Sequence, residues 1–290
     1  MNIRKSNRSD SSKPLYGNLC LKVVSRIINF MLVLVVIYPM LFILLTSFKD
    51  NEEFYTNVWG FPQIWRWSNY TYAWVSAHIG GYALNSLIVT VSAVAISVVL
   101  AALAGYALSK MFIPKANVII SILMALNFIP GVAVYISLYS QMISMGLNRT
   151  LWILILPYMA WQIPFSVYIL KQFFDSLPAE LLEAARVDGS GEIYTFTKIV
   201  LPLVKPAIAT VTVFNFVTIW GEYMWASIAA SATMSIATLP VGLLYFRGEY
   251  GIEWGPFAAA IMIIVVPMVI IFTYFQKYFV QGITAGAVKG

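Results

Sequence analysis

The sequence predicts an all-α polytopic membrane protein with six transmembrane helices in one domain. Hydrophobic residues make up 60% of the 290 residues, charged residues make up only 10%, and the mean hydropathy is +0.81. A chain with so few polar groups cannot cover a water-exposed surface, so the lipid bilayer must be its main solvent. The sequence also contains long intervals without any charged residue, and a helix needs about 20 apolar residues to cross the hydrocarbon core.

Six spans follow from these intervals, in chain order at 25–47, 83–108, 117–139, 151–171, 206–229 and 257–279. They form one membrane domain, 25–283, which is preceded by a polar N-terminal extension, 1–24, and followed by a short tail, 284–290. The charge-free interval 67–109 begins with residues rich in Trp, Tyr and Gly. Such aromatic residues favour the membrane interface, so we expect a loop there and a single span at 83–108.

Small residues and prolines characterise the middle spans. Ser97, Ala101 and Gly105 lie four residues apart on the second span, a pattern that allows two helices to approach closely. Pro130-Gly131 in the third span, and two prolines in the fourth, interrupt backbone hydrogen bonding. Such a kink is tolerated where protein or a water-filled cavity satisfies the freed carbonyl groups. Helix packing and gating both remain open as roles for these kinks.

The Lys and Arg residues are distributed unequally over the two sides of the membrane. With six spans, both termini lie on one side, and only four of the 18 Lys and Arg residues fall on the other, namely Lys49, Arg66, Arg149 and Arg247. Cytoplasmic loops carry an excess of basic residues, so both termini and the loop 171–205 are predicted to be cytoplasmic. The same bias explains the net charge of +6 without a nucleic-acid partner.

The loop 171–205 contains a short predicted helix, 178–189, with a marked beginning and end. Pro178 suits the first turn, Glu180 lies near the positive N-terminal end, and Gly189 suits a left-handed cap after the last turn. Its apolar residues share one face, formed by Leu181, Ala184 and Ala185. A short amphipathic helix at the membrane surface has a shape that fits a groove of another protein.

The sequence predicts that the chain is not an enzyme. His78 is the only histidine, so neither a histidine-based metal site nor a His-dependent triad is available. The pattern G-x-x-x-x-G-K-[ST], which cradles nucleotide phosphates, does not occur, so any ATP hydrolysis must come from a separate subunit. The acidic residues of the 171–205 loop lie in a surface helix and turn, where solvation or partner contact is expected: Asp175, Glu180, Glu183, Asp188 and Glu192.

Glu222 is the one acidic residue within a predicted span. A charged group in the membrane costs about 2.5–3.5 kcal/mol on insertion scales, so Glu222 should face a cavity, a subunit interface or a polar partner. Trp220, Tyr223 and Trp225 flank it in the sequence, and aromatic faces beside a carboxylate commonly hold a sugar ring. Two roles stay open, a sugar contact and a structural acid bonded to a neighbouring helix. The candidates for lining a substrate pathway are Asn127, Trp161, Gln162, Asn215, Trp220, Glu222 and Tyr223.

Three motifs resemble those of a known family. The pattern E-A-A, three residues, G, nine residues, I-x-L-P runs from Glu183 to Pro202 and resembles the cytoplasmic loop of binding-protein-dependent ABC importer permeases. Asn85-Ser86 and the segment 104–110 look like those of carbohydrate importer permeases. The last nine residues, 282–290, are similar to the C-terminus of the maltose-type second permease subunit.

This resemblance implies a type I ABC importer permease fold and a subunit that imports a sugar or oligosaccharide across a bacterial or archaeal cytoplasmic membrane. The expected partners are a second permease subunit, an ABC ATPase dimer, an extracytoplasmic solute-binding protein, the sugar and membrane lipid. The chain itself is expected to bind no cofactor, because the ATPase subunits bind the ATP. In maltose-type systems the best-defined sugar site lies in the other permease subunit.

The resemblance also assigns a role to the 178–189 helix. It would be the coupling helix, which docks on the ATPase through Glu183, Ala184, Ala185, Arg186, Asp188 and Gly189. The alternative reading of the residues is a secondary transporter driven by an ion gradient, with Glu222 as its coupling acid.

Overall fold

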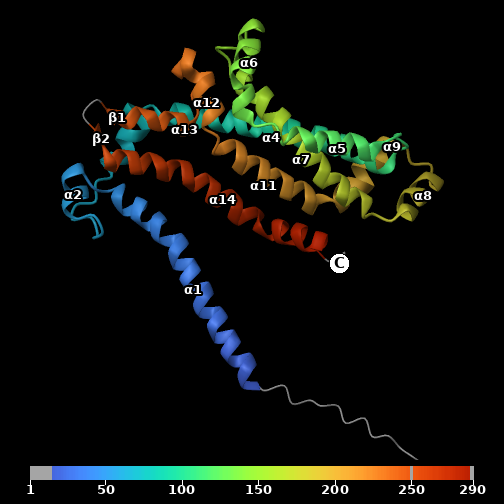
Figure 1. Cartoon of the computed structure of the whole chain (residues 1–290), viewed down its shortest axis with the longest axis horizontal. Coiled ribbons are helices and arrows are strands. Elements are labelled where there is room, and N and C mark those ends of the chain that lie inside the picture. Colours follow the sequence, from blue (N-terminus) through green and yellow to red (C-terminus); the bar gives the residue numbers. More distant parts are fainter. Residues whose placement is uncertain (1–14, 249–250, 288–290) are drawn as a thin grey trace, which may run out of the picture.

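The computed structural model describes residues 15–248 and 251–287, with side chains described for 21–246 and 251–276. The regular secondary structure of this part is helical except for two short antiparallel strands, β1 (Arg247–Gly248) and β2 (Gly251–Ile252). The strands pair Arg247 with Ile252 and Gly248 with Gly251. The predicted all-α class is therefore confirmed (Figure 1).

Four helices in the described part are long and apolar enough to cross a membrane, namely α1 (Leu15–Thr46), α4 (Ile79–Lys110), α7 (Trp152–Asp175) and α14 (Trp254–Ala287). They correspond to the predicted first, second, fourth and sixth spans, with differences of one residue at the end of the first and the start of the fourth. Two bent pairs of helices bring the number of spans to six if each pair crosses once. α14 continues to Ala287, so 284–287 of the expected tail are helical, and 288–290 lie outside the described residues.

The predicted third span, 117–139, is not one straight helix. α5 (Ala116–Leu126) and α6 (Gly131–Ser144) meet at an angle of 91°. Pro130 has no backbone N–H and disfavours helical conformation at the residue before it, so the helix cannot continue through this point. The interruption predicted at Pro130-Gly131 is thus confirmed, and it turns the chain through a right angle.

The predicted fifth span, 206–229, is also divided. α11 (Lys205–Trp220) ends before Gly221, and α12 (Met224–Ala229) begins after Tyr223. The segment Glu192–Leu203 precedes α11 and meets it at 77°. By contrast, Pro157 and Pro164 lie inside α7 without ending it.

The remaining described elements are short and connect these helices. They are α2 (Asn51–Thr56), α3 (Ser68–Thr71), the π-helical η1 (Tyr72–Ser76), α8 (Ala179–Val187), α9 (Glu192–Tyr194), the π-helical η2 (Thr195–Val200), α10 (Leu201–Leu203), the 3-10 turns η3 (Ala230–Ala232) and η4 (Met234–Ile236), α13 (Leu239–Gly242) and the 3-10 turn η5 (Leu243–Phe246).

The small residues of the second span hold α4 close to α7. Ser97, Ala101 and Gly105 are all buried. A Cβ atom on Gly105 would lie 3.2 Å from the backbone nitrogen of Lys171 on α7. The close approach predicted from the four-residue spacing is therefore confirmed, and α4 and α7 form the centre of the bundle.

The buried side chains gather in two clusters, one toward each end of the bundle. One cluster joins the N-terminal halves of α4 and α7 to α12, α13 and α14, and it includes Ile79, Ile153, Trp225, Leu239 and Ala259. The other joins the C-terminal halves of α4 and α7 to α8, η2 and α11, and it includes Tyr106, Leu170, Phe174, Leu182 and Val211. The second cluster fixes α8 to the bundle.

The two ends of the bundle carry different elements. Figure 1 shows α8 and α9 at one end, and α2 with β1 and β2 at the opposite end. The C-terminal end of α1 lies against the bundle near α2, and the rest of α1 extends away from the bundle (Figure 1). Its residues 21–38 are exposed, whereas residues 46–48 are buried.

Candidate functional site

α8 has the caps that its sequence predicts. Glu180 lies in the first turn and Arg186 in the last, so both charges favour the helix dipole. After the helix, Gly189 adopts φ +75°. Its N–H donates to the Arg186 carbonyl at 3.0 Å, and the Ser190 N–H donates to the Ala185 carbonyl at 2.9 Å. These two bonds are those of a Schellman motif, so the left-handed cap predicted at Gly189 is confirmed.

The buried face of α8 differs from the predicted apolar stripe. Leu182 and Ala185 are buried, whereas Leu181 is half-buried and Ala184 is exposed. The expectation that Leu181, Ala184 and Ala185 share the buried apolar face is therefore wrong. The buried face contains Leu182 in place of Leu181 and does not include Ala184. Two adjacent leucines fit the helical period about equally well, and the choice is made by contact with the neighbouring core, which includes Phe174.

A polar connection joins α8 to α9 and to α4. The Arg186 guanidinium pairs with Glu192 at 3.0 Å, and the Tyr106 hydroxyl of α4 donates to the same carboxylate at 3.1 Å. The Tyr106 ring also packs on Phe174 and Phe196, with centroid distances of 5.7 Å and 4.9 Å. Glu192, for which the sequence predicted solvation or partner contact, thus links α4, α8 and α9.

The base of the α7–α8 connection is held in the same way. Asp175 accepts from the Ser109 hydroxyl at 2.6 Å and pairs with Lys171 at 2.7 Å. The Lys110 ammonium donates to the Leu177 carbonyl at 2.8 Å. Each pair at the surface contributes little alone, but together they attach the loop to both central helices.

The outward surface of the α8–α9 segment combines charged and apolar side chains. Of the predicted docking residues, Glu183, Ala184, Arg186, Asp188 and Gly189 are exposed, and only Ala185 is buried. Two further apolar side chains stand free, Val187 at 88% and Ile193 at 81% exposed. Exposed apolar side chains on a helix that is packed against the rest of the fold are typical of a protein-binding surface.

The sequence analysis did not select Val187 and Ile193. Val187 lies inside the E-A-A…G pattern at a position that the pattern leaves free. Only the orientation of α8 on the bundle reveals that its side chain faces away. We name the exposed residues Glu183, Ala184, Val187 and Ile193 the docking surface, after the role that the sequence predicts for this segment and that is proposed below.

Glu222 lies between α11 and α12 and caps α12. Its carboxylate accepts from the backbone N–H of Trp225 at 2.9 Å and of Ala226 at 3.1 Å. The Tyr158 hydroxyl of α7 donates to it at 2.5 Å. Three donors and the positive end of a helix therefore compensate this acid. This arrangement favours the structural role over the role of a proton carrier.

Aromatic rings surround this point on α6, α7 and α12. Trp161 lies 5.7 Å from Tyr135, 5.9 Å from Tyr158 and 6.0 Å from Trp225, measured between ring centroids. The structure thus brings Trp161 and Glu222, two of the predicted pathway residues, into one cluster. Tyr135 and Tyr158 were not selected from the sequence, because uncharged tyrosines in an apolar span give no distinguishing signal.

Two of the other predicted pathway residues join helices. Asn215 is fully buried and donates to the Ser97 and Ser166 hydroxyls at 3.2 Å and 3.0 Å, so it joins α4, α7 and α11. The Trp220 indole donates to the Ile264 carbonyl of α14 at 3.0 Å. Gln162 is buried, while Asn127 and Tyr223 are exposed.

Among the described residues, no group of three or more His, Cys, Asp or Glu side chains could hold a metal ion.

The chain is similar to membrane subunits of known importers. The profile of the family described as binding-protein-dependent transport system inner membrane component matches residues 97–285. The chain is 36% identical over 262 residues to the probable ABC transporter permease protein YurM of Bacillus subtilis, a match that covers 90% of this chain and 86% of that protein.

Two other relatives carry substrate names. The chain is 32% identical over 257 residues to the diacetylchitobiose uptake system permease protein NgcG of Streptomyces coelicolor, covering 88% of this chain and 85% of that protein. It is also 32% identical over 266 residues to the trehalose/maltose transport system permease protein MalG of Thermococcus litoralis, covering 90% and 94%.

The fold is similar to that of a solved transporter. A chain in the crystal structure of a bacterial ABC transporter involved in the import of the acidic polysaccharide alginate superposes with a TM-score of 0.78 at 23% sequence identity. The superposition covers 92% of this chain and all of that one.

Proposed function

Because this chain belongs to the family of binding-protein-dependent transport system inner membrane components, we propose that it is the sugar-translocating subunit that couples to its ATPase through α8. The family assignment makes the chain a multi-pass permease of an ABC importer in the cytoplasmic membrane, and a transporter subunit is not an enzyme. The alternative of a secondary transporter driven through Glu222 has no support in these similarities.

The observation that supports the coupling role is the packing of α8 against α4 and α7. Leu182 packs in the same core as Leu170 and Phe174, and Arg186 and Glu192 tie the segment to α4. A displacement of the docking surface should therefore move α8, α4 and α7 together as a rigid body. We propose that ATP binding draws the ATPase subunits together and that this movement shifts the pore from inward-facing to outward-facing.

The orientation in the membrane belongs to the same proposal. The docking surface lies at the end of the bundle opposite α2 and β1–β2 (Figure 1), and only four of the 18 basic residues fall on the α2 side of the predicted topology. We therefore place α8 and both termini in the cytoplasm, and the β1–β2 loop on the side of the solute-binding protein.

The coupling role is tested by a charge on the docking surface. Val187→Asp places a carboxylate at an exposed apolar position in the last turn of α8. Its unfavourable interaction with the helix dipole costs at most about 1 kcal/mol, so the fold should be retained while contact with an apolar groove is lost. Apolar anchors at the centre of an interface often contribute about 1–2 kcal/mol or more, so we expect the ATPase recovered with the tagged permease to fall about tenfold.

Phe112→Asp is the matched control, because Phe112 is equally apolar and exposed near the same end but lies outside the docking surface. ATPase recovery should stay at the unsubstituted level in this variant. Equal recovery with Val187→Asp and with the unsubstituted chain would count against α8 as the ATPase contact.

The substrate class is supported by the relatives. NgcG and MalG are named for diacetylchitobiose and for trehalose and maltose. We therefore propose a sugar or oligosaccharide substrate, delivered by a solute-binding protein to a pore formed with a second permease subunit. The test is to purify the binding protein that associates with the transporter and to screen its ligands by calorimetry. Tight binding of amino acids or peptides, without binding of sugars, would overturn the sugar assignment while leaving the coupling role intact.

A further inference from the structure

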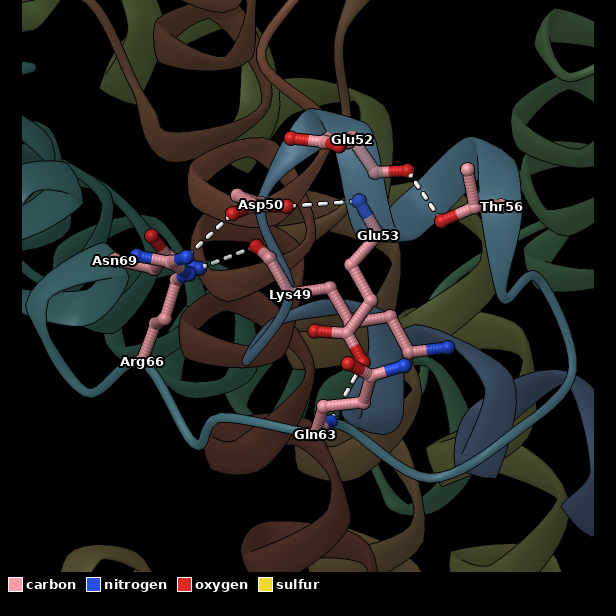
Figure 2. A network of polar contacts seen from close by, with 8 residues as sticks. All are labelled: Lys49, Asp50, Glu52, Glu53, Thr56, Gln63, Arg66 and Asn69. Carbon is pink, nitrogen blue, oxygen red and sulfur yellow. Dashed lines mark hydrogen bonds and ion pairs between the residues drawn. The ribbon is translucent and has the colours of Figure 1, made fainter.

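Residues 49–66, after α1, form a loop that is closed at its neck. The Arg66 guanidinium pairs with Asp50 at 2.5 Å, and the Arg66 N–H donates to the Phe48 carbonyl at 3.0 Å. Figure 2 shows Asp50 between Arg66 and the backbone nitrogen of Glu53, which donates to it at 2.8 Å. Asp50 thus closes the loop and caps α2 at the same time.

The charged groups inside the loop are used to fix its shape. Lys49 is fully buried, and its ammonium donates to the carbonyls of Asn57 at 2.5 Å and Val58 at 3.3 Å. Burial lowers the pKa of Lys49, and the nearby Glu53 carboxylate opposes this shift. Glu53 accepts from the Gln63 N–H at 2.6 Å (Figure 2). The conformation of the tip is therefore held by polar contacts on its inner side.

The outer side of the tip is apolar. Residues 58–65 contain no charged residue. Their exposed side chains include Trp59 at 69%, Phe61 at 75% and Ile64 at 61%. We call residues 58–65 the foot. Large apolar side chains gathered on one short loop are not expected to face bulk water.

The foot lies on the bilayer side of the end of α1. The Trp59 ring lies 5.9 Å from Tyr38 and 5.1 Å from Phe42, measured between centroids. These residues precede Thr46, the last residue of α1, by eight and four positions, which corresponds to about 12 and 6 Å along a helix. The chain therefore leaves the membrane after Thr46 and turns back toward it.

The depth of α1 supports the same conclusion. The charge-free part of the chain from 27 to 48 would measure about 33 Å as a helix, close to the hydrocarbon thickness of about 30 Å. Tyr38 then lies near the middle of the span, and Phe42 lies about 9 Å from the end at residue 48. Because Tyr38 and Phe42 border the exposed apolar surface of α1, the surface of the foot continues the surface of a membrane-spanning helix.

We propose that the foot inserts into one leaflet of the lipid bilayer, below the headgroups, and anchors the end of α1. The exposed Trp59, Phe61 and Ile64 side chains are large and apolar, and the uncharged outer side of the foot suits lipid better than an aqueous partner. α1 diverges from the bundle (Figure 1), and the ring contacts of Trp59 with Tyr38 and Phe42 join the foot to its C-terminal half. The proposal requires only that α1 crosses the membrane, and the coupling role of α8 does not enter it.

Spin labels measure the depth of the foot directly. Cys20→Ser removes the only native cysteine, and Phe61→Cys or Ile64→Cys then places a single nitroxide on the foot. Val35→Cys is the reference for a lipid-facing site on α1, and Glu52→Cys is the aqueous reference on exposed α2. The sample is the assembled transporter in lipid nanodiscs, with cysteine-free partner subunits, and the readout is collision with oxygen and with a nickel chelate.

We expect oxygen collisions to exceed nickel collisions several-fold at positions 61 and 64, as at 35, with the reverse at 52. Nickel access at 61 and 64 equal to that at 52 would place the foot in water and overturn the proposal. Exclusion of both reagents would overturn it as well, because it would mean that a partner protein covers the foot. The two foot positions are independent, so poor assembly of one variant leaves the other as the test.

Discussion

Glu222 illustrates how single polar side chains hold this chain together at the level of the residue. Its carboxylate caps the N-terminus of α12 and also accepts a hydrogen bond from Tyr158 of α7. Asn215 joins α4, α7 and α11 through two serines. In both cases a group that would be costly in an apolar setting is satisfied by donors or acceptors from other parts of the fold.

The capping role of Glu222 predicts a difference between two substitutions. Glu222→Leu should lower the free energy of unfolding by about 1–3 kcal/mol, because it leaves the N–H groups of Trp225 and Ala226 without an acceptor. Glu222→Gln keeps one acceptor oxygen and should cost clearly less, with transport retained. Denaturation of the purified protein and sugar uptake in vesicles are the two measurements. A Gln variant as stable as the unsubstituted protein but without uptake would instead indicate a proton-coupling acid.

The buried contact between Asn215 and Ser166 is suited to a double-mutant cycle. Asn215→Ala and Ser166→Ala should show a coupling of about 0.6 kcal/mol, the average for hydrogen bonds between membrane helices, and at most about 1.7 kcal/mol. Asn85→Ala is the control, since Asn85 bonds to the carbonyls of Ser235 and Ala237 at the other end of α4, and it should be additive with Asn215→Ala. Zero coupling between Asn215 and Ser166 would mean that this bond does not fasten the helices.

These residues could be found in the sequence, but their partners could not. Glu222 and Asn215 are conspicuous because polar groups in apolar spans are rare. Nothing in the sequence marks Tyr158 or Ser166 as their partners, because the spans are apolar on every side and their rotation about their axes is set only by packing. For the same reason the list of pathway residues mixed Asn215 and Trp220, which join helices, with Trp161, which lies near Glu222.

At the level of the element, α8 was the best predicted part of the chain. Its boundaries follow from local chemistry, because Pro178 and Gly189 act within one turn of the backbone. Its buried face was misplaced, because that face depends on a distant core. The division of the third span also has a local cause in Pro130, whereas the angle of 91° comes from what surrounds it.

The cap of α8 predicts the effect of a side chain at position 189. The φ of +75° disfavours any residue with a Cβ atom, at a cost of about 1–2 kcal/mol, and no neighbouring atom lies within 4 Å of the added Cβ. Gly189→Leu should therefore insert normally but misplace the end of α8, with loss of uptake and of ATPase stimulation. Gly189→Asn is the matched control, since Asn tolerates this conformation best after Gly, and it should keep most activity. Full activity of the Leu variant would show that coupling does not require the left-handed cap at the C-terminus of α8.

At the level of the whole molecule, composition predicted the fold class and the approximate positions of the helices. The apolar intervals give the length and hydrophobicity of each segment, and these two properties determine whether a segment inserts into the membrane. They did not predict that α1 diverges from the bundle or that the chain folds back at Trp59. Both depend on contacts between residues of equal hydropathy, such as Trp59 and Tyr38, which composition cannot distinguish.

The proposed topology makes a prediction for the whole chain. In the Cys20→Ser background, Ser190→Cys reports on the α8 end of the bundle and Glu52→Cys on the α2 end. An impermeant maleimide added outside intact cells should label position 52 and spare position 190, and lysis should expose position 190. The physical basis is the basic bias, since only four of the 18 Lys and Arg residues fall on the α2 side, and such a bias orients spans during insertion. The opposite pattern would invert the chain and place the docking surface out of reach of any ATPase, so this one measurement bears on the coupling role as well as on the topology.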